Sequence, residues 1–481
     1  MPYRDLREFI DVLGQKNLLK RIKTAVSADL EIAEITDRVS KAGGPALLFE
    51  NVPGHTLPVA INLFGTAERM ALALDVPNLD ALTERLGSLL AMAMNPPTGG
   101  FIEKIKTLPK LMEVASFLPK KVDGGMCKDV ILKGDQVDLE KLPVLKCWPQ
   151  DGGRFITFPL VFTYDPETGK RNVGTYRMQV YDKKTTGMHF HWHKDGARHL
   201  RKSKTPLQAA AVIGSDPAMC FAATLPLPPD VDECLFAGLV RQEGTRLTKA
   251  ETLDIDIPAN AEIVLEGTID PQERRREGPF GDHTGYYSLD DDFPVFRVQA
   301  ITHRKNPVYH TTIVGTPPQE DGYIGMAIER LMAPLMKMQL PELVDYHMPI
   351  EGIFHNLMLI SIKKQFPGHA RKVMHTIWGL GQAMFTKMIV VVDEDVNVHD
   401  YREVAWKALN HIDPQRDFEF SLGPIDILDH ASRLAGFGSH VGIDATTKWK
   451  SEGFDRRWPD EIKMSPEVVQ KIDRLWKELG L

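Results

Sequence analysis

Cysteine is scarce in this sequence, and its few copies are scattered. The 481 residues include four cysteines, none of which forms a CxxC pair: Cys127, Cys147, Cys220 and Cys234. A disulfide framework or a cysteine-ligated zinc site needs closely spaced pairs, so we expect neither. Long apolar runs are missing too, because none reaches the roughly 20 residues that cross a membrane. The chain is charged from its start, which is not typical of a signal peptide, and we expect a cytoplasmic protein.

Blocks of like charge are also absent. The 58 Lys and Arg and the 65 Asp and Glu residues give a net charge of −7 that is spread along the chain. No basic run predicts a nucleic-acid partner, and no basic face strongly predicts a membrane surface, which leaves only a peripheral membrane contact open. A GxSxG motif, a Walker loop and a GxGxxG after a strand are missing, which argues against serine hydrolases, P-loop NTPases and Rossmann dehydrogenases.

What the chain has is length and an average globular composition. Hydrophobic residues make up 43% and charged residues 26% of the sequence, and a chain of this length is expected to form about two to four domains. We predict an α/β (α+β) protein with small molecules and other subunits as partners. The predicted parts are an N-terminal α/β region (1–115), a barrel-like β domain (116–316), a C-terminal α/β domain (317–450) and a tail helix (451–481).

Apolar periodicity predicts the individual elements. Helix and strand signals alternate up to a Pro- and Gly-rich break at 95–100, which a basic connector follows to about residue 121. Turn signals then separate many short strands, among them 155–164, 172–181, 187–193 and 261–269. Helices return at 323–338, and the terminal helix at 466–479 is of a kind that often docks on a neighbouring subunit.

Two carboxylates frame the turn-rich stretch REGPFGDHTGYY (276–287). Glu277 and Asp282 flank Gly-Pro-Phe-Gly, a composition that predicts a tight bend. Two carboxylates in different surroundings can share acid and base work at neutral pH. Taken alone, such a pair is more often a solvated acidic turn.

The segment NVGTYR (172–177) lies on a predicted strand. Alternation places Asn172 and Gly174 on one face, and Thr175 and Arg177 on the other. An arginine that faces a barrel interior needs a carboxylate or an anion. An exposed strand arginine is the equal alternative.

Three histidines alternate in MHFHWH (188–193). On a strand, His189, His191 and His193 would project from one side. Together with a carboxylate they could bind a divalent metal, or they could instead surround a phosphate or a ring. A half-buried strand is the plain alternative. Glu233 could be such a carboxylate, or it could cap a helix that begins near Asp230 or Asp232. The acidic run at 392–397 lacks the glycine of a calcium loop and predicts only a turn after a strand.

Several separated motifs together resemble the UbiD family. They are GGPALLFENV (43–52), NLFGT (62–66), NVGTYR, EGPFGDHTGYY and GIDATTKW (442–449), and the resemblance covers essentially the whole chain. It looks closest to the polyprenyl-4-hydroxybenzoate decarboxylases of ubiquinone or menaquinone biosynthesis. The resemblance implies a reversible, non-oxidative carboxy-lyase of aromatic or α,β-unsaturated acids that uses prenylated FMN. It also implies a central split β-barrel of flavin-reductase type and a C-terminal α/β oligomerisation domain.

The family's functional residues carry over onto matching positions. The catalytic set becomes Arg177, Glu277 and Asp282, with Asp282 as proton donor where ferulic acid decarboxylases have glutamate. Its pKa is expected to be raised by desolvation, while Glu277 stays ionised against Arg177. The family's metal ligands, usually for Mn²⁺, fall on Asn172, His193 and Glu233. Contacts to the flavin fall on these three and on Thr175, Tyr176, Arg177, His189, Phe190, His191, Lys194 and Asp195.

The resemblance also implies partners. These are the aromatic acid and CO₂, a flavin prenyltransferase that supplies the cofactor, and further copies in a homodimer or homohexamer, with K⁺ or Na⁺ as an additional candidate ion. Three alternatives stay open. They are a non-catalytic flavin-binding or assembly subunit of a carboxylase complex, a metal-dependent hydrolase that uses the histidine run, and a decarboxylase of another aromatic or heteroaromatic acid in degradation.

Overall fold

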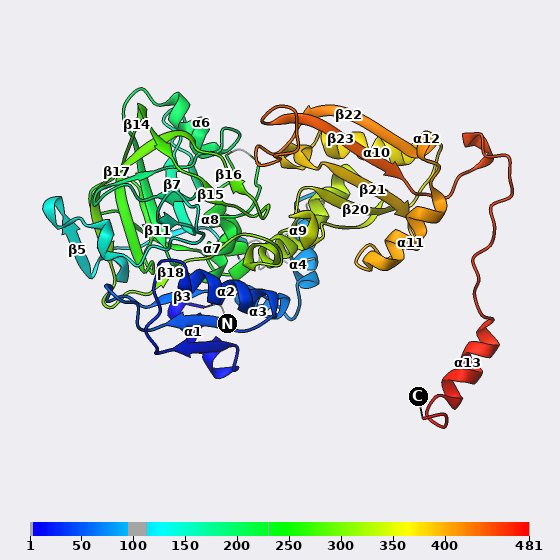
Figure 1. The fold of residues 1–481 in the computed structure, drawn as a ribbon, viewed down its shortest axis with the longest axis horizontal. Coiled ribbons are helices and arrows are strands. Elements are labelled where there is room, and N and C mark those ends of the chain that lie inside the picture. The colour runs from blue at the N-terminus through cyan, green and yellow to red at the C-terminus, as the bar shows by residue number, and fades with distance from the viewer. Residues whose placement is uncertain (1–2, 95–111, 113, 229, 481) are drawn as a thin grey trace, which may run out of the picture.

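The protein is described from a computed structural model that covers residues 3–94, 112, 114–228 and 230–480 (Figure 1). Most of the predicted connector between residues 95 and 121 lies outside this range. Helices and strands mix throughout the described chain, which confirms the α/β class. None of the described helices combines the length and the hydropathy that a membrane crossing requires.

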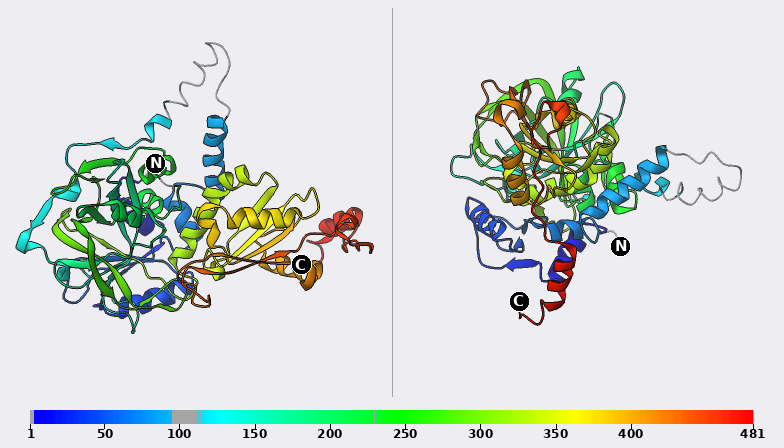
Figure 2. Two further views of the ribbon diagram at one scale, coloured as in Figure 1. Left: turned by 90° about the horizontal axis from the view of Figure 1, so that it is seen from above. Right: turned by 90° about the vertical axis from the view of Figure 1, so that its right-hand side faces the viewer.

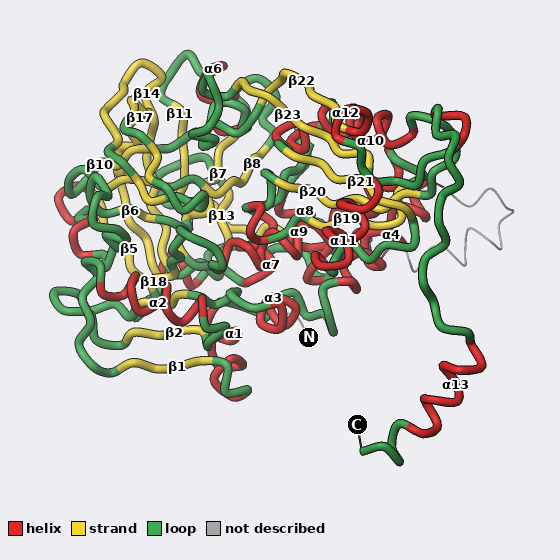
Figure 3. Tube along the Cα trace, turned by 45° about the vertical axis from the view of Figure 1, so that its right-hand side comes forward, coloured by secondary structure: helices red, strands yellow, loops and turns green. Residues whose placement is uncertain are grey.

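The N-terminal region is a small four-stranded sheet with helices packed on it. The strand order is β1-β2-β3-β18, so the last strand comes from far along the chain. In Figure 3 this sheet lies beneath the central sheet. Helix α1 begins after Asp5, whose carboxylate caps the Glu8 N–H, and it buries the apolar stripe that its sequence predicts. The elements are α1 (Leu6–Gln15), β1 (Leu19–Ile22), α2 (Glu31–Lys41), β2 (Ala46–Phe49), β3 (Val59–Ile61), α3 (Ala67–Ala73), α4 (Asp80–Met94) and β18 (Tyr309–His310).

A seven-stranded sheet forms the central domain. Its order is β10-β17-β14-β11-β7-β8, and β5 also pairs with β17. In the described residues this hydrogen-bonded path does not close on itself, so the β domain is an open barrel-like sheet. The strands are β5 (Val130–Lys133), β7 (Pro159–Tyr164), β8 (Arg171–Thr175), β10 (Thr185–Gly187), β11 (Leu207–Ile213), β14 (Ile263–Glu277) and β17 (Asp291–His303).

Shorter elements surround this sheet. They are three helices and three small separate sheets of order β13-β12-β4, β15-β16 and β6-β9. One apolar core runs from α1 and α3 through β7 to α7 and α8, so the N-terminal and central parts fold against each other. The elements are β4 (Lys120–Lys121), β6 (Phe155–Ile156), β9 (Met178–Gln179), α6 (Asp195–Lys202), α7 (Pro217–Ala222), α8 (Glu233–Arg241), β12 (Arg246–Lys249), β13 (Asp256–Pro258), β15 (Phe280–Gly281) and β16 (Tyr287–Ser288).

The C-terminal domain is a five-stranded sheet of order β19-β20-β21-β23-β22. Its first helix, α9, packs against α3 and α4 as well as against β19. It therefore connects the N-terminal region with the C-terminal domain. The elements are α9 (Glu320–Gln339), β19 (Leu343–His347), β20 (Leu357–Ile362), α10 (His369–Trp378), β21 (Met388–Asp393), α11 (Tyr401–His411), α12 (Pro414–Asp417), β22 (Phe418–Pro424) and β23 (Phe437–Asp444).

The tail helix α13 (Pro466–Leu475) follows an extended segment and lies away from the body of the molecule (Figures 1 and 2). Its apolar residues are exposed, among them Val468, Val469 and Ile472. The docking of this helix on a neighbouring subunit stays a prediction.

Four strand predictions need correction. The predicted strand 155–164 is two strands, β6 and β7, because β6 pairs with β9 whereas β7 pairs with β8 and β11. The predicted strand 172–181 is two strands, β8 and β9, with a break at Tyr176–Arg177, because β9 pairs with β6 instead of continuing along β7. The predicted strand 187–193 ends at Gly187, so the histidines lie on a loop. The predicted strand 261–269 continues as β14 to Glu277. Glu277, the first carboxylate of the turn-rich stretch 276–287, is therefore the last residue of β14.

Candidate active site

Arg177 occupies the break between β8 and β9 and is the centre of a buried ion-pair cluster. Its Nε donates to Glu277 Oε1 at 2.9 Å, and its Nη1 donates to Asp282 Oδ2 at 2.5 Å. Its Nη2 donates to the Ser288 hydroxyl at 3.1 Å. The guanidinium carbon lies 4.8 Å from the centre of the Phe280 ring. Residues about 100 positions apart in the sequence thus share one guanidinium, and their side chains are at most 10% exposed.

Glu277 is held from two sides. Besides Arg177, its Oε1 lies 2.8 Å from His189 Nδ1, and the His189 ring lies 4.1 Å from that of Phe293. Burial by itself raises the pKa of Glu277, but Arg177 and His189 outweigh it and hold the pKa below its ordinary value. Glu277 is therefore ionised, as the sequence predicts.

Asp282 is the first residue after β15 and shares its carboxylate between two partners. Oδ2 accepts from Arg177, and Oδ1 lies 2.8 Å from the His283 backbone N–H and 2.9 Å from its Nδ1. Burial raises the pKa of Asp282, yet Arg177 and His283 outweigh it and lower the pKa below its ordinary value. The expectation of a raised pKa is thus wrong for this arrangement, because the arginine expected to pair only with Glu277 contacts both carboxylates.

A second histidine, from the C-terminal domain, extends this cluster. His283 Nε2 lies 3.1 Å from His355 Nε2, and the His283 ring stacks on Phe354 at 5.4 Å. Burial lowers the pKa of His355 to about 4, so His355 is the neutral member that can accept a hydrogen bond from His283. Nearby Asp321, on α9, has a pKa raised to about 7 by burial, although His283 opposes the shift.

His355 and Asp321 were missed in the sequence. No motif surrounds either residue, and only the packing of the C-terminal domain against the 280–288 hairpin brings them to Asp282. His283 lay within the quoted motif but had no assigned role.

A second polar site lies at the start of α8. Asp232 caps this helix by accepting from the Cys234 N–H, and Glu233 Oε2 accepts from the Val173 N–H at 2.8 Å, next to Asn172. Glu233 is only 5% exposed, and burial raises its pKa to about 8, with Asp232 and Asp195 adding to the shift. The Asn172 amide nitrogen is buried without a hydrogen-bond partner in the described structure.

These two residues fit a divalent cation and a phosphate. A buried carboxylate whose charge is uncompensated and an unpartnered amide are the groups that such ligands would satisfy. Lys194, which directly precedes α6, is half-buried, and desolvation lowers its pKa although Asp426, Asp195 and Glu233 oppose the shift. Its Nζ donates to Gln382 Oε1 at 2.8 Å.

The histidine run does not form a three-histidine cluster. His189 binds Glu277, whereas both ring nitrogens of His191 are buried without a partner in the described residues. His193 is exposed, with its ring 5.4 Å from that of Phe385. The one-sided arrangement is wrong because the run is a loop, and the metal role of His193 stays a prediction.

The remaining predicted flavin contacts surround the same loop. The Tyr176 hydroxyl accepts from the Gly196 N–H at 3.3 Å, and the Tyr176 ring meets Phe190 edge to face at 4.9 Å. Thr175 ends β8 beside them and donates to the Ala223 carbonyl at 3.4 Å. The structure therefore brings the two clusters to the two ends of one short segment, 172–177.

Three consecutive parts of the sequence match the three domains of one family. Residues 10–89, 120–317 and 322–445 match the N-terminal, Rift-related and C-terminal domains of 3-octaprenyl-4-hydroxybenzoate carboxy-lyase, UbiD. The order of these matches agrees with the structure, in which a β-rich domain with the buried Arg177–Glu277–Asp282 cluster lies between two α/β parts. The chain belongs to the UbiD family and is an enzyme of the carboxy-lyase class.

Relatives resemble the chain over its full length. An uncharacterised protein of Archaeoglobus fulgidus is 50% identical over 484 residues, which covers 100% of this chain and 99% of the relative. The vanillic acid decarboxylase of Sedimentibacter hydroxybenzoicus, in its closed form, has a TM-score of 0.86 at 29% identity and covers 99% of this chain and 100% of its own.

The UbiD-class enzyme HmfF of Pelotomaculum thermopropionicum, solved with FMN, has a TM-score of 0.79 at 30% identity and covers 97% of this chain and 98% of its own. An evolved dimeric form of HmfF was solved with prFMN. These similarities extend over all three domains, so the fold is shared as a whole.

Proposed function

We propose that this protein is a reversible, non-oxidative decarboxylase of an aromatic carboxylic acid and that it uses prenylated FMN. The observation that carries the proposal is the buried Arg177 guanidinium, shared by Glu277 and Asp282 at 2.9 and 2.5 Å. A buried arginine with two carboxylates can bind a substrate carboxylate in exchange for one of its own partners. The structural similarity to HmfF, which was solved with FMN and with prFMN, supports the proposal of this cofactor.

The cofactor would lie along the segment from Asn172 to Arg177 and the loop from His189 to Asp195. Asn172 and Glu233, with His193 as the proposed third ligand, would hold a divalent ion such as Mn²⁺ against its phosphate. Lys194 adds a positive charge at the same end. Bound prenylated FMN supplies an electrophilic ring that accepts the electron pair left behind when CO₂ departs.

Arg177 orients the substrate. In this proposal the substrate carboxylate replaces Asp282 at Nη1, while Glu277 keeps its bond to Nε and fixes the guanidinium plane. Asp282, buried and released from its cationic partner, then has the raised pKa of a desolvated acid. The lowered pKa of Asp282 without substrate and its role as a proton donor are in this way compatible.

Asp282 delivers the proton. When the bond between the ring carbon and the carboxylate breaks, CO₂ leaves and that carbon takes a proton from Asp282. His283, 2.9 Å from Asp282, and His355, 3.1 Å farther on, provide a route by which the aspartate regains a proton. The route runs between the central and C-terminal domains, so both contribute to turnover.

The polar groups around Asp282 favour a hydroxylated aromatic acid. His283, His355 and Asp321 can exchange hydrogen bonds with a ring hydroxyl, which an entirely apolar pocket could not provide. We propose a 4-hydroxybenzoate-type acid, with quinone biosynthesis as the narrower assignment.

Co-expression with a flavin prenyltransferase tests the function. The purified protein is expected to carry a flavin absorption spectrum, to release CO₂ from hydroxybenzoate-type acids, and to exchange the corresponding ring hydrogen with solvent deuterium. The same screen includes heteroaromatic and acrylic acids. A flavin-loaded protein that neither decarboxylates nor exchanges any of these acids would refute the proposal.

A further inference from the structure

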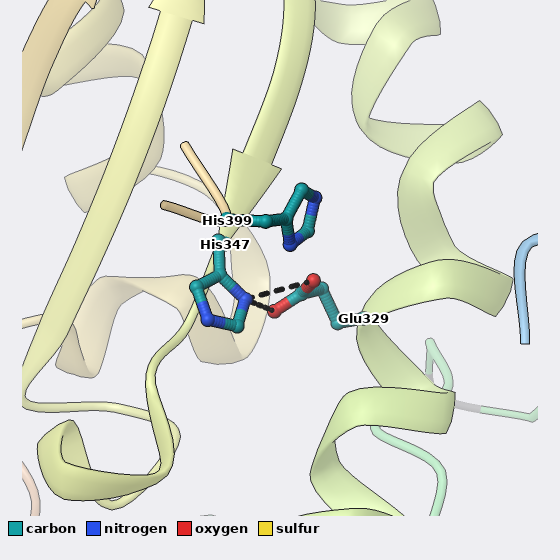
Figure 4. A group of neighbouring side chains, drawn as sticks. All are labelled: Glu329, His347 and His399. Atoms are coloured by element: carbon teal, nitrogen blue, oxygen red, sulfur yellow. Dashed lines mark hydrogen bonds and ion pairs between the residues drawn. The ribbon is translucent and has the colours of Figure 1, made fainter. Parts of the chain in front are cut away.

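A cluster of two histidines and one glutamate lies in the C-terminal domain, on elements other than those that form the Arg177 site. Glu329 belongs to α9, His347 ends β19, and His399 precedes Asp400, the residue that caps α11. Their ligand atoms all lie within 4.8 Å of one another. Figure 4 shows a nitrogen of each ring turned towards the Glu329 carboxylate. We propose that this cluster is a binding site for a divalent transition-metal ion of the zinc type.

The distances match two ligands of one ion. His347 Nδ1 lies 3.1 Å from Glu329 Oε2, and the rings of His347 and His399 lie 4.7 Å apart. Two adjacent ligands, each about 2.0–2.2 Å from zinc, are separated by about 3 Å or slightly more. A small approach of His399 completes a set of two imidazoles and one carboxylate, which leaves further positions for water.

The surrounding groups orient these ligands. Asp345 Oδ2 lies 2.9 Å from His399 Nε2, the arrangement in which a carboxylate fixes the tautomer and leaves Nδ1 for an ion. The Met348 N–H donates to Glu329 Oε2 at 2.6 Å, and Arg330 Nη2 donates to Oε1 at 2.8 Å. Each carboxylate oxygen has two lone pairs, so Glu329 retains acceptor capacity.

The charge balance favours a cation. Arg330 contacts both Glu329 and Asp345, so one guanidinium serves two carboxylates. With neutral imidazoles the cluster therefore carries a net negative charge, which attracts a cation. Because two of the three ligands are imidazoles, a borderline divalent ion is favoured. Glu329 is buried and His399 is partly exposed, which leaves an approach from solvent.

The ion ties three segments of the C-terminal domain together. It joins α9 to the end of β19 and to the turn between β21 and α11. That turn includes most of the acidic run at 392–397, whose first two residues still belong to β21. Because α9 also carries Asp321 towards His283, the ion stabilises the helix that supports one wall of the Asp282 site. The site is separate from the Asn172–Glu233 pair of the central domain.

Zinc binding to the full chain tests this assignment. The protein is treated with a chelator, desalted and titrated with ZnCl₂ by calorimetry, and with CoCl₂ by visible absorption. The variants are His399→Gln and His347→Gln, with His375→Gln, an exposed histidine of α10, as the matched control. Glu233→Gln removes the ligand proposed for the other metal.

We expect the wild type, His375→Gln and Glu233→Gln each to bind a zinc ion that His399→Gln and His347→Gln lose. That ion should raise the melting temperature by several degrees at saturation. Equal zinc stoichiometry and Kd in the wild type and both cluster variants would overturn the proposal. Zinc binding that disappears only in Glu233→Gln would overturn it as well.

Discussion

The substitution Asp282→Asn should have opposite effects on turnover and on substrate binding. Asp282 contacts Arg177 at 2.5 Å, and the two side chains are 7% and 10% exposed, respectively. Asparagine keeps the shape but carries neither the negative charge nor the acidic proton. The loss of a positioned general acid lowers kcat by about 10²–10⁴-fold. The arginine remains paired with Glu277, so its charge is not left isolated.

The same substitution frees Arg177 for the substrate carboxylate. A hydrogen bond to a charged group contributes about 1.5–3 kcal/mol. Since about 1.4 kcal/mol corresponds to a tenfold change in Kd, removing this competitor tightens substrate binding by roughly 10-fold to 100-fold. Turnover and affinity therefore move apart.

Two measurements separate these effects. Decarboxylation and ring-hydrogen exchange are followed with the prenylated cofactor, and Kd is measured by calorimetry with both proteins loaded with unmodified FMN, so that no reaction occurs. Asp291→Asn, an exposed carboxylate close by in the sequence, is the control and should change neither quantity. Full activity of Asp282→Asn, or binding weaker than in the wild type, would refute the reasoning.

Three further predictions concern the proton route, the metal and the core. His355→Leu interrupts the path to His283, so kcat should fall roughly tenfold or more at unchanged KM; an unchanged kcat in steady-state assays would exclude the route. The raised pKa of Glu233, about 8, means that the folded state binds a proton which the unfolded state has already released. The metal-free protein should therefore lose stability as the pH rises from about 4.5 to 8, and Mn²⁺ should remove this dependence; a melting temperature that rises over this range in chelator would contradict it. Phe162→Ala removes a fully buried ring from β7 and should cost about 3–5 kcal/mol in denaturant unfolding; a cost below about 1 kcal/mol would show that the site collapses without a cavity.

The sequence by itself determined the elements and the family. Apolar spacing predicts α9 closely, over 323–338 against the observed Glu320–Gln339, because one buried face decides a helix. The separated motifs identified the UbiD family, and with it Arg177, Glu277 and Asp282. The structure places these three side chains together. Their catalytic roles, and the metal and flavin roles of the other predicted residues, remain proposals.

Tertiary pairing decided the rest. Whether a run of alternating residues is one strand depends on the partner available, which is why 172–181 divides at Arg177 and 187–193 becomes a loop. The pKa of Asp282 depends on whether Arg177 contacts Asp282 as well as Glu277, and the spacing of these residues in the sequence does not reveal this. His355 and the Glu329–His347–His399 cluster have no local signal, because packing within the C-terminal domain and against the central hairpin brings their members together.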